Sequence, residues 1–189
     1  MKKLIFVLLA LFIGQAYAQQ GRPSTDFGSS KIIKVQFNRP ANVTAYAAND
    51  AVTNSTSAGV PIAFDRAARF KGGSGYVTSV TISADTANAT NATFDLILYS
   101  DSASVATPAD NAAFPLDSTN NGKRIGVVQI AFQTYGTGST AAIGTASNLN
   151  IPFQCESYSD NIYGILVAKA AYQPKHTGRF TIRLSVERN

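Results

Sequence analysis

The stretch YVTSVTIS, residues 76–83, decides the fold class of this chain. β-branched residues dominate it, and successive side chains of a strand point to opposite faces. The stretch therefore predicts a strand whose side chains divide between two faces. The two expected faces are Tyr76, Thr78, Val80 and Ile82, and Val77, Ser79 and Thr81.

Short β-branched and aromatic runs of the same kind recur along the chain, separated by clusters of Asn, Asp, Gly and Ser. They are residues 31–37, 60–64, 93–100, 124–133, 149–154, 161–169 and 179–187, with a shorter ninth candidate at 44–46. The helical period is nearly absent. This series predicts an all-β fold, a single β-sandwich or jelly roll of eight or nine strands. In 93–100, Phe94, Leu96 and Leu98 are expected on one face, and Pro152 predicts an edge strand or a bulge.

The N-terminal residues have the pattern of an export signal. Lys2 and Lys3 precede an apolar run of 11 residues, and Ala16-Tyr17-Ala18 supplies a small-x-small cleavage site. The run is too short for the roughly 20 residues of a membrane-spanning helix. We expect a signal peptide at 1–18, a flexible leader at 19–30 and the sandwich at 31–189. Cleavage after Ala18 predicts a periplasmic or extracellular chain without a membrane partner.

The charge pattern argues against a nucleic-acid partner. The chain has 16 Lys and Arg against 11 Asp and Glu, and loss of Lys2 and Lys3 lowers the net charge from +5 to +3. The basic residues are scattered, whereas a nucleic-acid surface shows a clustered patch. Cys155 is the one cysteine, so no intrachain disulfide can form, and we expect it to be a small buried residue.

No catalytic, cofactor or metal site is predicted. His176 is the one histidine and falls in an expected surface loop. The glycine-rich segment 71–75 lacks phosphate-loop spacing, so Gly72, Gly73 and Gly75 are expected to form a structural turn. One open alternative is a Ca²⁺ site in the loop that contains Asp101, Asp110 and Asp117. The chain is therefore expected not to be an enzyme.

Two polar stretches, 101–121 and 134–148, are predicted to be long loops and contact surfaces.

Several segments, in one order, resemble a family of small tailed-phage structural proteins. The segment 108–114, PADNAAF, resembles the P-x-D-N-A-A-F loop of that family and is the most specific match. The other similar segments are Phe37–Pro40 (F-x-R-P), Thr44–Asp50 (T-x-Y-x-x-x-D), Phe64 with Arg69 and the glycine turn, Phe94–Tyr99, Ile162–Val167 and Ala171–Pro174.

The resemblance implies a virion structural protein that decorates or stabilises a capsid. Its implied partners are a major capsid protein or other virion subunits, together with further copies of itself. Asp110, Asn111 and Phe114 are then candidate residues of a contact loop. The leader is expected to lie across an adjacent subunit, and an edge strand such as the one with Pro152 is expected to accept a partner strand.

A second interpretation is an exported sandwich that binds a ligand of the bacterial envelope, such as a glycan. Its stacking platforms would be Tyr46, Tyr76, Tyr99, Tyr135, Tyr158 and Tyr172. The export signal conflicts with a capsid role because capsids assemble in the cytoplasm. Three explanations stay open: a virus with an exported structural protein, a cell that has adopted a viral sandwich, or an apolar segment that is retained for assembly.

Overall fold

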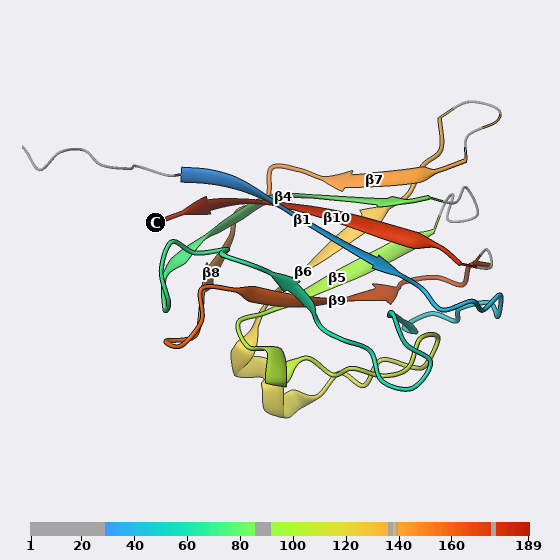
Figure 1. Ribbon diagram of the computed structural model, residues 1–189, viewed down its shortest axis with the longest axis horizontal. Helices are drawn as coiled ribbons and strands as arrows, with labels where there is room; N and C mark the ends of the chain where they lie inside the picture. Colours follow the sequence, from blue (N-terminus) through green and yellow to red (C-terminus); the bar gives the residue numbers. More distant parts are fainter. Residues whose placement is uncertain (1–28, 86–91, 136–137, 139, 175–176) are drawn as a thin grey trace, which may run out of the picture.

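The alternating segments of the sequence form two antiparallel sheets that pack face to face in the computed structural model of the protein (Figure 1). The structure describes residues 29–85, 92–135, 138, 140–174 and 177–189. The expected signal peptide, most of the expected leader and His176 therefore lie outside the described residues. The all-β sandwich predicted from the sequence is confirmed.

The first sheet has the order β1-β10-β4-β7, and β8 pairs with the other half of β4. Its strands are β1 (Ser29–Asn38), β4 (Ser74–Ala84), β7 (Ala142–Ala146), β8 (Ile151–Gln154) and β10 (Arg179–Arg188). The second sheet has the order β2-β9-β5-β6, and β3 also pairs with β9. Its strands are β2 (Ala51–Val52), β3 (Ile62–Phe64), β5 (Thr93–Tyr99), β6 (Arg124–Ala131) and β9 (Ile162–Ala168).

The ten strands occupy eight positions. β7 and β8 pair with successive parts of β4, and β2 and β3 pair with successive parts of β9, so each pair is one interrupted strand. Numbered by position along the chain, the sheets then have the orders 1-8-3-6 and 2-7-4-5. This alternation between sheets is the strand order of a jelly roll with two Greek keys.

A β-bulge in β4 changes the faces that simple alternation predicts for 76–83. Ser79 pairs with Ser185 of β10, but Val77 pairs with Val186, so Thr78 is an extra residue. The bulge shifts the alternation by one, and Val77 joins Val80 in the core. The prediction that these two valines lie on opposite faces was therefore wrong.

In the second sheet, the neighbouring strands β5 and β9 have buried side chains on both faces. Phe94, Leu96 and Leu98 belong to the core between the sheets, as their alternation predicted. Ile97 and Tyr99 belong to a smaller apolar cluster on the outer face. Phe114, from the loop between β5 and β6, packs against that outer cluster. This loop contains two short 3-10 helices, η2 (Ser102–Ser104) and η3 (Ser118–Lys123), at the lower edge of Figure 1.

Three local predictions need correction. The expected loop 134–148 contains β7, a short strand with the sequence AIGTA. The candidate strand at 44–46 is a single bridge between Tyr46 and Tyr172. β1 begins at Ser29, so the last two residues of the expected leader belong to the sheet.

Two further predictions fit the structure. Pro152 lies in β8, which pairs with β4 alone among the described strands. Cys155 is a buried free thiol.

Candidate functional site

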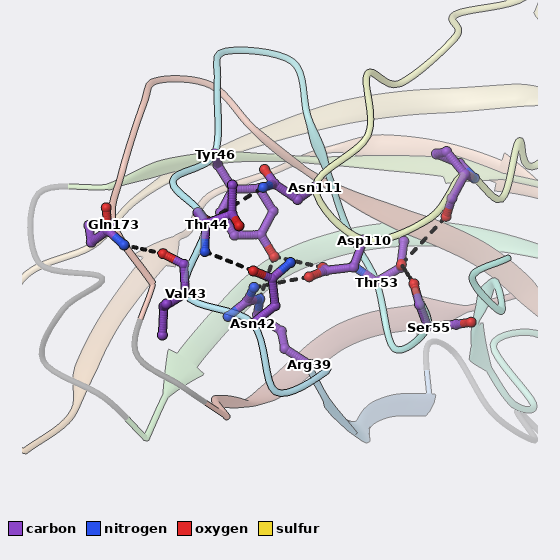
Figure 2. A network of polar contacts seen from close by, with 11 residues as sticks. Arg39, Asn42, Val43, Thr44, Tyr46, Thr53, Ser55, Asp110, Asn111 and Gln173 are labelled. Carbon is purple, nitrogen blue, oxygen red and sulfur yellow. Dashed lines mark hydrogen bonds and ion pairs between the residues drawn. The ribbon is translucent and has the colours of Figure 1, made fainter. Parts of the chain in front are cut away.

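A buried polar network joins three chain segments at one end of the sandwich (Figure 2). β1 ends at Asn38, and Arg39 continues its pairing, since the Arg39 amide donates to Gly178 O at 2.8 Å. The chain then turns, and Tyr46 bridges to Tyr172 from the segment that follows β9. The third segment is the loop between β5 and β6, which contributes Asp110.

The Asp110 carboxylate is the centre of this network. Its Oδ2 accepts a hydrogen bond from Arg39 Nη2 at 2.9 Å, and the side chains of this ion pair are only 1% and 0% exposed. Its Oδ1 accepts from Tyr46 Oη at 2.6 Å and from the Thr53 amide at 2.9 Å. Arg39 Nε also donates to Tyr46 Oη. Both carboxylate oxygens are thus bonded inside the molecule, as a buried charge requires.

Aromatic rings enclose the network. The Tyr46 and Tyr172 rings stack with their centroids 4.7 Å apart, and the Arg39 guanidinium lies 4.8 Å from the Tyr46 centroid. Phe94 from the core meets the Tyr172 ring edge-on at 5.2 Å. Burial is the main cause that raises the pKa of Tyr46 far above its ordinary value. The electrostatic interaction with Tyr172 and the hydrogen bond to Asp110 raise this pKa further. Burial also raises the pKa of Tyr172.

Arg39 remains a cation in this setting. Burial by itself lowers its pKa, but the neighbouring Tyr46 and Asp110 outweigh burial and raise it above the ordinary value. The network is therefore a charged pair with a neutral tyrosine, and all three groups are closed to solvent. A substrate cannot reach any of them, so the arrangement fixes structure and offers no acid, base or nucleophile to a ligand.

The network anchors the long loop that crosses the outer face of the second sheet. The Asp110 amide donates to Ser55 O at 2.7 Å, and the next amide, of Asn111, donates to Ala51 O at 2.9 Å. Asn111 has a φ of 62°, in the left-handed region that Asn tolerates better than most residues. The Phe114 amide donates to Asn49 O at 2.8 Å. Of the three expected contact residues, Asp110 is buried, and Asn111 and Phe114 are partly exposed.

The carboxylates considered for Ca²⁺ have separate roles. Asp101 caps η2 and accepts from Tyr158 Oη at 2.9 Å. Asp117 caps η3 through the Thr119 amide. Asp110 forms the buried ion pair with Arg39. Across the described part of the chain, no three His, Cys, Asp or Glu side chains are placed to hold a metal ion together.

The expected glycine turn leads into β4, and its geometry depends on glycine. Gly72 has a φ of 73°. A Cβ on Gly73 would lie 2.8 Å from Phe70 O, and one on Gly75 would lie 2.3 Å from Glu187 O and 2.9 Å from the Phe153 ring. Any larger side chain at Gly75 would force β4 away from β10.

The tyrosines considered as sugar platforms divide into three groups, one of which is Tyr172 alone: it is partly buried and stacks on Tyr46. Tyr46 and Tyr99 are 1% and 2% exposed, so neither can stack on a ligand. Tyr76, Tyr135 and Tyr158 are 38%, 74% and 62% exposed. Among the described residues no helix has the length and apolar character to cross a membrane.

Sequence reasoning singled out Asp110 but missed its partners as a site. Arg39 was named only within a short motif, Tyr46 was also expected to be a stacking platform in a strand candidate, and Thr53 was not noted. The available signal was the co-occurrence of three separate motifs, 37–40, 44–50 and 108–114, in one chain. The structure brings one residue of each motif into contact.

No family model matches the chain, and no curated protein matches it. Among solved structures, a chain of the cyanophage Pam1 capsid asymmetric unit is similar over 92% of this chain and 96% of its own, with 15% identity and a TM-score of 0.35. A Desmodium yellow mottle tymovirus chain is similar over 88% and 90%, with 14% identity and a TM-score of 0.29. A chain of the Bacillus endospore appendages, described as disulfide-linked pili, is similar over 90% and 99%, with 13% identity and a TM-score of 0.26. Likenesses of this strength carry no argument about what the chain does.

Proposed function

We propose that this protein is a non-enzymatic structural subunit of a virion, which decorates or stabilises the capsid as an oligomer. The observation that carries the proposal is the Arg39–Tyr46–Asp110 network. It joins the three motifs that resemble tailed-phage structural proteins, and it uses the buried charges to fix a loop on the outside of the sandwich. A rigid jelly roll with an anchored surface loop suits a subunit that makes fixed contacts in a lattice.

The surface of the anchored loop supports the same role. A groove of about 370 Å³ crosses the outer face of the second sheet, with Leu116 and Val127 exposed by 59% and 49%. Phe114 lies in the same groove and Asn111 of the same loop is partly exposed, so the proposed contact surface includes these two residues rather than the buried Asp110. The lining of the groove also includes Arg124 and the Asp95–Lys169 ion pair, and an apolar centre with a polar rim is typical of a protein interface.

The export signal expected at residues 1–18 is part of the proposal. Under it, the mature chain begins at Gln19 and joins the particle outside the cytoplasm, with a major capsid protein or another virion subunit as partner. The glycan-binding alternative has less support, because Tyr46 and Tyr99 are inside the fold.

A binding experiment tests the proposal. The mature chain, residues 19–189, is mixed with capsids that lack it and sedimented through a density gradient. We expect the chain to sediment with the capsids and to saturate at a fixed copy number. A Leu116→Asp, Val127→Asp double variant should lose this co-sedimentation, whereas Tyr135→Ser, which removes an exposed aromatic residue elsewhere, should keep it. Equal sedimentation of both variants would contradict the proposed surface, and no sedimentation of the unaltered chain would contradict the role.

A further inference from the structure

β1 forms an open edge of the first sheet. Its ten residues pair with β10 without a register shift. The bond from the Arg39 amide to Gly178 O fixes the phase of this ladder, because hydrogen-bonded pairs alternate along antiparallel strands. Odd-numbered residues of β1 therefore bond to β10, and the backbone groups of Ile32, Lys34 and Gln36 point away from the sheet. Within the described residues, no strand pairs with this side of β1.

A cavity of about 200 Å³ opens between the sheets beside this edge. It is lined by β1 on one side and by β3 and the residues before it on the other, chiefly Val35, Phe37, Val60, Pro61, Ile62 and Ala63. Val60 is 64% exposed at its rim. A strand added to β1 would direct every second side chain into this cavity.

The opposite side of the sandwich is closed. There the chain after β6 is joined to β7 by two backbone hydrogen bonds between Gln133 and Ile143, of 2.9 and 3.0 Å. Gly126 of β6 also lies against Ile151 of β8, which contains Pro152. The structure therefore favours β1, and not the edge with Pro152, as the place where a strand can be added.

The charge of the β1 edge restricts the occupant. Lys34 lies in the middle of the strand, and Lys31 donates to the backbone oxygens of Asp65 and Arg66 at one end of the gap between β1 and β3. Two β1 edges paired about a two-fold axis would place the Lys34 residues of both copies opposite or diagonal to each other in the central registers. Like charges in these positions are destabilising, so a segment with a neutral or acidic sequence fits better.

We propose that the β1 edge and its cavity accept residues 24–28 of a second copy as an added strand. The sequence STDFG follows Pro23, which cannot donate to a ladder, and its five residues match the span of the outward groups from Ile32 to Gln36. Phe27 supplies a large apolar side chain for the cavity, and Asp26 supplies an acid for Lys34. This contact explains how the subunit would form the oligomer of the proposed function. It rests on that proposal only for the statement that the subunit associates with itself.

The donor is a second copy because the segment runs directly into β1 of its own chain. Folding back requires a turn of at least two residues whose closing pair uses an outward residue of β1, so the nearest turn would be Gly28 and Ser29. Such a hairpin would remove Ser29 from its pairing with Arg188 and would pair residues 24–27 with residues 30–33. Pro23 would then lie opposite Lys34 without an N–H to donate, so the outward groups of Lys34 and Gln36 would have no strand.

Cysteine cross-linking between separately purified copies tests this contact. Both copies are mature chains that carry Cys155→Ala; one also carries Phe27→Cys and the other Ala63→Cys at the cavity wall. We expect the mixture to form a disulfide-linked dimer at least about tenfold faster than a matched mixture in which Ile143→Cys, an exposed position of β7 on the closed side, replaces Ala63→Cys. Equal rates in the two mixtures, or a bond formed only within a chain that carries both cysteines, would overturn the proposal.

Two further variants separate the contact from the fold. Replacing residues 19–28 by a Gly/Ser sequence of equal length should abolish self-association measured by analytical ultracentrifugation, with unchanged urea unfolding. Lys34→Pro removes one outward amide but no bond to β10, and it should weaken self-association about fivefold. Unchanged association in both variants would contradict the proposal. These assays use the isolated chain, so a failure of self-association would contradict the β1 contact without affecting capsid sedimentation. A failure of capsid sedimentation would contradict the proposed function without affecting self-association.

Discussion

Replacing Asp110 by Asn tests the buried network that holds the surface loop in place. The amide keeps the shape of the carboxylate, and its oxygen can still accept from Tyr46 and from the Thr53 amide. It removes the negative charge that faces Arg39 at 2.9 Å and puts an N–H₂ donor against the guanidinium. The variant therefore changes the electrostatics of the site while the packing stays almost constant.

The expected cost is large because both partners are closed to solvent. Breaking a buried ion pair by removing one charge costs about 3–5 kcal/mol. Domains of this class unfold with about 5–15 kcal/mol, so the variant should lose at least about a fifth of its stability. For a chain of this length each kcal/mol lowers Tm by about 2–4 °C, which predicts a decrease of roughly 10 °C.

Urea unfolding of the mature chain measures this cost. We expect a lower midpoint with an unchanged m value, because the folded and unfolded surfaces do not change. The matched control is Asp85→Asn, which breaks the exposed pair with Arg179 and should cost about 0–1 kcal/mol. The double variant Asp110→Asn, Arg39→Met should recover part of the loss. A cost below about 1 kcal/mol for Asp110→Asn, or strict additivity in the double-mutant cycle, would refute the reasoning.

Three other predictions follow from buried groups. The folded-state pKa of Tyr46 is raised above its ordinary 10, so the stabilisation that its protonated form provides is complete below pH 10 and is lost as the pH rises beyond it. The free energy of unfolding, measured at pH 9, 10 and 11, should therefore fall by up to about 1.4 kcal/mol per pH unit because of Tyr46, and Tyr46→Phe should reduce that slope. Gly75→Ala should cost about 3 kcal/mol or leave no folded protein, whereas Gly122→Ala, where no atom lies within 4 Å, should cost under about 0.5 kcal/mol; calorimetry compares the two, and similar Tm values would contradict the geometry. Burial raises the pKa of Cys155 to about 11, so a thiol reagent at pH 8 should label the native chain only as fast as the chain opens, and immediate labelling without urea would contradict its burial.

The strands in which apolar side chains alternate strongly could be predicted from the sequence. β5 is an example, because Phe94, Leu96 and Leu98 alternate with residues of a different cluster. β7 has the sequence AIGTA, and its pairing depends on its neighbour β4 rather than on its own composition, so a polar loop was predicted instead. The β4 bulge could likewise not be predicted from the sequence, because it is defined only by the register of β4 against β10.

The network shows the same limit for the candidate site. Arg39 and Asp110 are separated by 71 positions, so no local sequence pattern connects them. An aspartate in a loop that contains Asn, Pro and Ala predicts an exposed turn residue on composition alone. Its burial follows from Tyr46 and Tyr172, which stack above it and come from opposite ends of the chain.

Peptide mass spectrometry of gradient-purified particles from the source culture tests the central claim most directly. The structural-subunit account predicts peptides from residues 19–189 in the particle fraction at a constant ratio to the major capsid protein, with Gln19 as the N-terminal residue. Absence of the chain from the particles, together with its recovery in the cell envelope fraction, would contradict the account.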